Sequence, residues 1–476
     1  MMMGRVTVKF PRWTVGICLV AGLLVAGVAP GAMMAQTPEA TPIATPGGAS
    51  ATPQPVTRPT DEQLRAAGVN ELGVVPVLMY HTFTSDPANV GEWTRTLDGF
   101  RDQLQQLYDM GFVTIPMRDL LENRIDVPLG KHPIVLTFDD SSASQFLIDQ
   151  NADGTISPRP GSGVGVLEEF FNTHPDFGHS AFFAVVPDYC FADADIDALN
   201  AYDSCQAKLD WLAGHGYEIG NHTISHANLG TVDPGEFVEE VGGTVEWIDE
   251  RVSGPANMSR VLMLPYGGRP EPGSKVDALL NGWFRYDGED IKLEAVVDVG
   301  GGPTFSPSST WWDPMAITRF NTDPASMDYW LGQFASGDVI LYTSDGNPDT
   351  ITVPNPIPDF LANEFDAGAI QADGKQLVRY DTRTHGDGPP PRHDRPATPA
   401  AAASLAIGQT AVTTDSGVRL RDEPGTDGTV LDELPTGANL QLLDGPTSLD
   451  GQTWWKVKTD DGEIGWVVAE YLRPAP

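Results

Sequence analysis

The central part of the sequence alternates short apolar runs with segments of helical periodicity, and this alternation constrains the fold most strongly. Runs with the length and composition of buried strands lie at 75–80, 132–138, 217–221, 260–265 and 337–343. Between them, apolar residues recur at helical spacing, as Phe100, Leu104 and Leu107 do. Strands that alternate with helices are joined by crossovers and run parallel, and uniformly apolar strands are covered on both faces. The sequence therefore predicts an α/β fold, most simply a closed (β/α) barrel.

Low-complexity segments divide the chain. Two of them, rich in Pro with Thr or Ala, have no periodicity that could bury a face, so we interpret them as linkers. The tail alternates short apolar runs with turns of Gly, Pro and Asp, which predicts a small all-β barrel. The predicted parts are a signal peptide or N-terminal anchor (1–35), a linker (36–70), the α/β barrel (71–386), a second linker (387–407) and the β tail (408–474).

The N-terminal segment is typical of an exported protein. Arg5, Lys9 and Arg12 precede an uncharged stretch that ends in small residues, as in a cleaved signal peptide. The stretch is also nearly long enough to span a bilayer, so an uncleaved anchor is the alternative. Export places the rest of the chain where disulfides form, and we expect Cys190 and Cys205 to be joined rather than free.

The strong negative charge restricts the partners. The chain has 29 basic and 65 acidic residues and a formal net charge of −36. Nucleic acid and anionic membrane surfaces would be repelled by such a surface. A neutral or cationic glycan is compatible with it.

Polar residues stand at the ends of the predicted strands. His81 ends the first run, Asp139 and Asp140 end the second, His222 ends the third, and Tyr266 follows the fourth. In a (β/α) barrel the carboxyl ends of all strands meet at one mouth, where functional groups collect. We therefore expect these five residues to lie around one mouth.

Two histidines near this mouth have the spacing of a metal site. His222 and His226 are four residues apart, so both imidazoles can reach one ion if the segment turns helically. A carboxylate from the neighbouring strand end would be a third ligand and would leave a position for water. The second carboxylate would then be available as a general base.

Three motifs resemble the polysaccharide deacetylases, also called the NodB-homology family or carbohydrate esterase family four. They are LTFDD (136–140), GNHTISH (220–226) and LPYG (264–267), in this order and at successive strand ends. The resemblance implies a distorted, TIM-like (β/α) barrel. It also implies a hydrolase that uses a divalent metal, most often Zn²⁺ but also Co²⁺, Ni²⁺ or Fe²⁺. Its substrate would be an N-acetylated, or sometimes O-acetylated, polysaccharide such as an N-acetylglucosamine-containing glycan or peptidoglycan.

The resemblance also implies a role for each matching residue. Asp139 corresponds to the general base, and Asp140, His222 and His226 correspond to the metal ligands. Tyr266 corresponds to the residue whose backbone N–H helps to bind the oxyanion.

The sequence departs from the family pattern at two positions. Met263 stands where many members have an arginine that contacts the base, and Thr343 stands where the last motif has a catalytic histidine. The first and last strands of a closed barrel are neighbours, so a histidine on the first can reach the same space. The run that ends in His81 resembles the last motif moved to the first strand, as in the circularly permuted branch of the family that deacetylates poly-N-acetylglucosamine. His81 would then be the catalytic acid, and a structural histidine is the alternative.

Three further residues complete the predicted site. Arg319 is a candidate to replace the missing arginine. Trp311 and Trp312 are candidates to stack on a sugar ring, with packing in the core as the alternative.

The tail resembles bacterial Src-homology-3-type domains from VRLRDEP (418–424) to GWVVAEYL (465–472). The resemblance implies binding to cell-wall peptide or glycan, so we expect a secreted, cell-wall-associated deacetylase. A catalytically silent barrel that binds glycan is the alternative function, and the two departures favour it.

Overall fold

The computed structural model describes the barrel and most of the tail. The described residues are 58–193, 195–357, 365–382, 405, 407–413, 418–425, 428–435, 437–449, 452–460 and 462–475. The predicted signal peptide or anchor, most of the first linker and nearly all of the second lie outside them. Within the described residues, no helix is long and apolar enough to cross a membrane.

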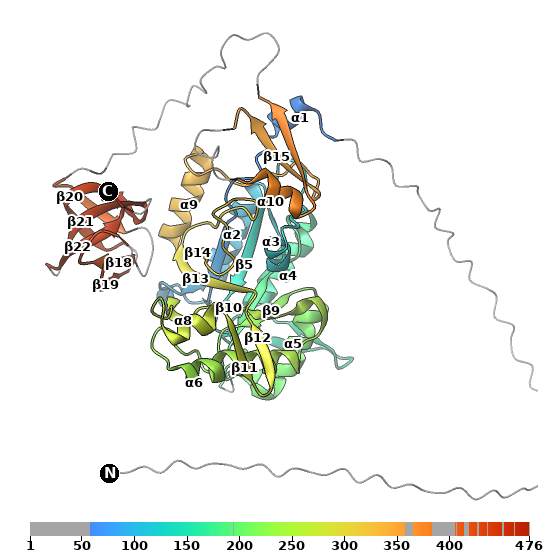
Figure 1. Ribbon diagram of the computed structural model, residues 1–476. Coiled ribbons are helices and arrows are strands. Elements are labelled where there is room, and N and C mark those ends of the chain that lie inside the picture. The colour runs from blue at the N-terminus through green and yellow to red at the C-terminus, as the bar shows by residue number, and fades with distance from the viewer. Residues whose placement is uncertain are drawn as a thin grey trace, which may run out of the picture. The chain divides into compact units, whose positions relative to one another are not determined.

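Seven parallel strands close into a barrel, which confirms the predicted α/β barrel (Figure 1). In order around the ring they are β1 (Val77–Tyr80), β14 (Ile317–Asn321), β13 (Ala295–Gly301), β10 (Asn257–Met263), β9 (Glu218–Asn221), β8 (Phe182–Val185) and β5 (His132–Phe138). Leu78 of β1 is in register with both Phe320 and Leu136, so β1 closes the ring between β14 and β5. The short strand β4 (Phe112–Thr114) pairs with the first three residues of β5, from His132 to Ile134.

Helices pack on the outside of these strands. They are α2 (Leu97–Asp109), α3 (Met117–Leu121), α4 (Gly163–Thr173), α5 (Cys205–Gly214), α6 (Pro234–Phe237), α7 (Gly243–Asp249), α8 (Lys275–Leu280) and α9 (Pro324–Ser336). Helix α2 begins where the Thr96 hydroxyl accepts a hydrogen bond from the Gly99 N–H. Its apolar residues Phe100, Leu104 and Leu107 are fully buried, as their helical spacing predicts.

The alternation of side chains along β5 decides which carboxylate faces the barrel interior. Leu136 and Phe138 belong to the outer core under the helices, whereas Val135 belongs to the inner core. Since successive side chains of a strand point to opposite faces, Asp139 continues the inward series. The strand then ends, because Asp140 has a positive φ of 72°. Asp139 is consequently 1% exposed, and Asp140 is half-buried beside it.

The expected strand at 337–343 is not a barrel strand. Its backbone forms only isolated bridges, including Val74 N–H to Ile340 O (2.8 Å) and Tyr342 N–H to Val74 O (2.9 Å). Apolar composition alone predicted a strand there. Because β1 already pairs with both β14 and β5, the ring has no open edge at which this segment could join.

A small accessory layer lies beside the barrel and changes one predicted boundary. It contains helices α1 (Asp61–Ala66) and α10 (Ala367–Ala372) and strands β15 (Thr350–Asn355) and β16 (Gln376–Asp381). Helix α1 falls within the predicted linker 36–70. Thr60 and Gln63 form a capping box at its start, and Leu64 packs with Val69 and Tyr380. The ordered part therefore begins before residue 70.

Three two-stranded sheets complete the α/β part of the chain. They are formed by β2 (Thr82–Thr84) with β3 (Thr94–Thr96), β6 (Ile148–Gln150) with β7 (Ile156–Pro158), and β11 (Trp283–Tyr286) with β12 (Glu289–Lys292).

The predicted disulfide joins Cys190 to Cys205, whose Cα atoms are 5.6 Å apart. It fixes the connection after β8 to the start of α5.

The tail is an all-β unit, as predicted. Its seven antiparallel strands are β17 (Thr410–Thr413), β18 (Val418–Arg421), β19 (Val430–Leu434), β20 (Asn439–Leu449), β21 (Gln452–Thr459), β22 (Ile464–Val468) and β23 (Leu472–Pro474). Leu420, Leu440, Trp455 and Val467 are among the residues of its separate core. The tail therefore has a core of its own.

Glu71, in the segment before β1, is a buried carboxylate with an unusual pKa. It is 1% exposed and accepts hydrogen bonds from the N–H groups of Thr352 (2.6 Å) and Asp345 (3.1 Å). Burial raises the pKa of Glu71 to about 8, the charge of Asp345 adds to this, and the hydrogen bonds act in the opposite direction. The folded state therefore holds a proton that the unfolded chain releases near pH 4.5.

We expect this proton to make folding stability decrease with rising pH. Below about pH 4.5 both states bind the proton, and between pH 4.5 and 8 only the folded state does, so the free energy of unfolding falls across this interval. The loss should be on the order of a few kcal/mol. Denaturant unfolding at pH 5 and pH 8 measures it. Glu71→Gln cannot ionise, and the same decrease in this variant would contradict the assignment.

Candidate active site

The carboxyl ends of the barrel strands bring the predicted polar residues together. His81 follows β1, Asp139 and Asp140 follow β5, His222 follows β9, and Arg319 lies within β14. Because β1 lies between β14 and β5, His81 emerges between the strand that carries Arg319 and the strand that precedes the two carboxylates. The predicted mouth is therefore present in the fold.

Asp139 forms a bidentate ion pair with Arg319. Each guanidinium NH₂ group donates to one carboxylate oxygen, and both distances are 2.8 Å. The side chains of Arg319 and Asp139 are 0% and 1% exposed. Parallel bonds of this kind fix both the position and the plane of a carboxylate. The pair therefore holds Asp139 in one orientation at the mouth.

Arg319 reaches Asp139 past Met263, the residue at the usual arginine position. One guanidinium nitrogen lies 3.0 Å from the Met263 sulfur and 2.9 Å from the Thr137 hydroxyl. The Nε of Arg319 donates to the Asp298 carbonyl at 2.7 Å. Asp139 thus has an arginine partner that comes from another strand.

Opposing effects determine the pKa of Asp139. Burial by itself would raise it, but the positive charge and hydrogen bonds of Arg319 outweigh burial and hold the pKa below its usual value. The carboxylate is therefore ionised at neutral pH and can accept a proton.

Asp140, His222 and His226 form a cluster suited to a metal ion. The Nε2 atoms of His222 and His226 lie 3.3 Å and 3.1 Å from the same oxygen of Asp140. One ligand atom from each residue lies within 4.8 Å of the other two. Burial would raise the pKa of Asp140, but the hydrogen bonds to the two histidines outweigh it and lower the pKa. The carboxylate is therefore in the charged form that a metal requires.

The donor set fits a divalent ion in geometry and in tautomer. Tetrahedral ligands about 2.1 Å from zinc lie about 3.4 Å from one another, close to the two distances from Asp140. The Nδ1 of His222 lies 2.8 Å from the Met263 carbonyl oxygen, to which it can donate a proton. In the neutral tautomer with the proton on Nδ1, Nε2 has a lone pair for an ion, and binding of the ion would replace the contact of Nε2 with Asp140.

The segment that carries the two histidines is a loop rather than a helical turn. Thr223 and His226 both have positive φ values, 62° and 63°. The Asn221 side chain accepts a hydrogen bond from the Thr223 N–H, and the Thr223 hydroxyl accepts one from the Ala227 N–H. The two imidazole rings nevertheless meet, with centroids 4.9 Å apart. Local side-chain bonds, not helical periodicity, bring them together.

His81 lies next to the carboxylates but is not held by a hydrogen bond from Nδ1. That atom is buried and has no partner among the described residues. The Trp93 indole packs against the ring in a T-shaped contact, with centroids 4.7 Å apart. Burial lowers the pKa of His81 to about 4, while Asp139 and Asp140 act in the opposite direction.

Tyr266 lies next to His226 of the candidate metal cluster. It adopts a positive φ of 57° directly after Pro265, and its side chain is 65% exposed. The Tyr266 ring packs on His226 with centroids 4.4 Å apart. Most of Tyr266 is therefore open to solvent beside the cluster.

Trp312 and Thr343 are not at the mouth. Ser308, four residues before Trp312, accepts a hydrogen bond from Asn123, which follows α3. The first residue of α3 in turn donates to Glu218 at the amino end of β9, so this segment lies at the end of the barrel opposite the mouth. Trp312 is partly buried there against the inner core, which corrects its prediction as a sugar platform in favour of core packing. Thr343 lies 3.2 Å from Nδ1 of His132, the first residue of β5.

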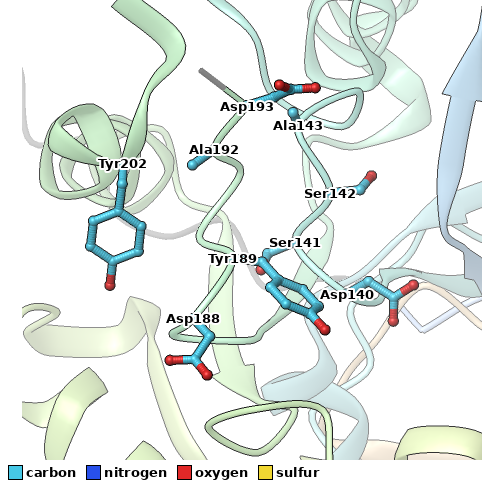
Figure 2. A pocket seen from close by; sticks show the side chains of 9 residues that line it. All are labelled: Asp140, Ser141, Ser142, Ala143, Asp188, Tyr189, Ala192, Asp193 and Tyr202. Carbon is cyan, nitrogen blue, oxygen red and sulfur yellow. The ribbon is translucent and has the colours of Figure 1, made fainter. Parts of the chain in front are cut away.

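A cavity of about 530 Å³ adjoins Asp140. Figure 2 shows that its lining comes from the connection after β5 and the connection after β8. The lining residues are Asp140, Ser141, Ser142, Ala143, Asp188, Tyr189, Ala192, Asp193 and Tyr202. Sequence reasoning did not find Asp188, Tyr189 or Tyr202, because no motif marks this connection. In the sequence, only the cysteine pair Cys190 and Cys205 drew attention to this connection.

Family models match two segments of the chain. Residues 126–278 match the polysaccharide deacetylase model, and residues 416–473 match the bacterial SH3 domain model. No curated protein sequence matches. Both predicted resemblances are therefore confirmed.

Several solved structures are similar to the barrel at low identity. Deacetylase PplD of Streptococcus pyogenes, solved with acetate, is 18% identical, with 55% of this chain and 98% of that chain covered and a TM-score of 0.38. IcaB from Ammonifex degensii is 17% identical, with 55% and 97% covered and a TM-score of 0.37. A polysaccharide deacetylase from Bacillus cereus is 16% identical, with 52% and 65% covered and a TM-score of 0.37.

Proposed function

We propose that this chain, which carries a polysaccharide deacetylase domain and a bacterial SH3 domain, hydrolyses acetyl groups from an N-acetylated, or also O-acetylated, polysaccharide. The observation that carries the proposal is the buried, bidentate Asp139–Arg319 pair beside the cluster of Asp140, His222 and His226. It combines an oriented base with three ligands for a divalent ion, of which Zn²⁺ suits the donor set best.

Asp139 would activate the attacking water. Asp140, His222 and His226 would hold a divalent ion, which would act as a Lewis acid for the acetyl carbonyl. Asp139 accepts a proton from the water as the oxygen adds to the carbonyl carbon, while Arg319 keeps the carboxylate in position. Since Asp140 is committed to the ion, the two neighbouring carboxylates have different roles.

His81, in its imidazolium form, would supply a proton to the leaving amine. Burial of the ring opposes this form, and the charges of Asp139 and Asp140 favour it. As the C–N bond breaks, the sugar nitrogen takes this proton, which balances the proton that Asp139 removed from water. The products are acetate and a glycan with a free amine. The backbone N–H of Tyr266 is the proposed donor to the oxyanion.

Two observations weaken the alternative of a silent glycan-binding barrel. Met263 removes the usual arginine, but Arg319 contacts the same carboxylate. Thr343 belongs to a segment that is not a barrel strand, so it does not stand in for a missing acid. The usual arginine therefore has a replacement within the fold, and Thr343 is no evidence that an acid was lost.

The most informative test is acetate release from a panel of substrates. The panel contains N-acetylglucosamine oligomers, peptidoglycan and acetylated xylan, each with and without added divalent metal. We expect release from at least one N-acetylated glycan, and we expect a chelator to abolish it. Binding to glycan without acetate release under any condition would support the silent alternative.

We expect the metal to depend on the three ligands. Purified protein should hold about one divalent ion per chain, and His226→Ala should lose it, because two ligands bind far more weakly than three. Elemental analysis measures the content. His215→Ala is the matched control, because this exposed ring stacks on Trp211 in α5, outside the cluster. Equal metal in the wild type and His226→Ala would rule out the assignment.

We further propose that the protein is secreted and associated with the cell wall, and that the tail binds wall material. Deleting 408–474 should leave turnover of a small soluble oligomer nearly unchanged and reduce retention on cell-wall material, because the second contact is lost. A pull-down with purified walls measures retention. Equal retention of both forms would mean that the tail has another role.

A further inference from the structure

We propose that Trp93 is a positioning residue for His81, and that Arg95 and Asn321 hold it in place. The inference rests on the proposed function, because it concerns the proton that His81 gives to the leaving amine. It adds a residue that no motif indicated. Trp93 lies in the loop between β2 and β3, just before β3 begins at Thr94.

The orientation of the His81 ring is otherwise weakly determined. Catalytic histidines usually have one ring nitrogen bonded to a carboxylate or carbonyl, and this bond fixes the ring and its tautomer. The buried Nδ1 of His81 has no such partner among the described residues. The His81 ring packs against the Trp93 indole, at 4.7 Å between centroids and 62° between the planes. Packing against the indole therefore replaces the usual bond in fixing the ring.

A buried arginine holds the loop that presents Trp93. Arg95 is 4% exposed, and its guanidinium donates to the carbonyls of Gly91 (2.7 Å), Thr94 (2.9 Å) and Glu92. The Thr82 N–H donates to the carbonyl of Trp93 itself at 3.0 Å. The four carbonyls from Gly91 to Thr94 are thus all bonded, and the backbone beneath the indole has little freedom.

Strand β14 links this loop to the base. The Asn321 amide donates to the Glu92 carbonyl at 3.1 Å, and its oxygen lies 3.4 Å from the Arg95 guanidinium. Asn321 is two residues after Arg319, which holds Asp139. One strand end therefore positions the base directly and the acid through the Trp93 loop. The relative placement of the two proton-transfer groups depends on this single element.

The chemistry gives a way to distinguish this role from a merely structural one. An amine must be protonated as it leaves, because the amide anion is far too basic to depart from the tetrahedral intermediate. A nitrophenolate is a weak base and leaves without a proton. A misplaced His81 should therefore slow hydrolysis of an N-acetyl group much more than hydrolysis of 4-nitrophenyl acetate.

The experiment compares these two substrates in Trp93→Ala, Trp93→Phe and the wild type. For an N-acetylglucosamine oligomer we expect Trp93→Ala to lower kcat by about 10–100-fold with KM nearly unchanged. Removing a group that orients a metal-binding histidine typically costs as much. Turnover of 4-nitrophenyl acetate, metal content and melting temperature should stay close to those of the wild type. Trp93→Phe should retain most of the activity, because a phenyl edge can still contact the imidazole.

The matched control is Trp283→Ala, which removes an exposed tryptophan in the β11–β12 hairpin and should change neither reaction. Equal losses on both substrates, no loss on either, or a raised KM with kcat unchanged would overturn the inference. The variant His81→Ala distinguishes failure of the inference about Trp93 from failure of the proposed function. If His81→Ala loses only the amide reaction and Trp93→Ala does not, the positioning role is wrong. If His81→Ala keeps the amide reaction, the acid itself is wrong.

Discussion

Asp139→Asn is expected to lower acetate release by about 10²–10⁴-fold while the metal content stays at the wild-type level. The reason is that in the proposed mechanism Asp139 acts on the water, whereas Asp140, His222 and His226 form the candidate metal cluster. The same substitution should reduce the free energy of unfolding by about 3–5 kcal/mol, because the fully buried Arg319 keeps its charge and loses its anionic partner. Acetate release, elemental analysis and denaturant unfolding measure the three effects.

A second variant separates the loss of activity from the loss of stability. In the double variant Asp139→Asn with Arg319→Met, the unpaired charge is removed, so most of the stability should return. Turnover should stay low, because no base is restored. Wild-type turnover in Asp139→Asn would contradict the role as base. A double variant that is as unstable as Asp139→Asn would contradict the explanation by an unpaired charge.

His81→Ala is expected to lower turnover of an N-acetylated oligomer by about 10²–10⁴-fold, again with the metal retained. A positioned imidazole can protonate the leaving amine, whereas alanine cannot. Thr343→Val should leave turnover nearly unchanged, because Thr343 lies beside His132 at the amino end of β5. Acetate release and metal content are measured for both. Full activity in His81→Ala, or a comparable loss in Thr343→Val, would show that the acid is not His81.

The candidate metal cluster could be predicted from the sequence because its residues come from local motifs. Asp140 follows an apolar strand, and His222 and His226 lie within one short loop after another strand. In a parallel barrel all such strand ends reach the same mouth. The motifs therefore lie close together in space simply because the fold is a parallel barrel. The helical turn that was the condition for this spacing is absent between the two histidines, because hydrogen bonds from the Thr223 N–H to the Asn221 side chain and from the Ala227 N–H to the Thr223 hydroxyl form a loop there.

The sequence by itself determined the (β/α) barrel, the all-β tail and the grouping of polar residues at the strand ends, since each depends on local periodicity or on a short motif. Only the tertiary structure decided which arginine holds Asp139, that the segment before Thr343 is excluded from the ring, and that Trp312 packs in the core at the opposite end. These outcomes depend on how β1 pairs with β14 and β5. Such pairings join residues far apart in the chain, as Arg319 and Asp139 are, and no local pattern encodes them.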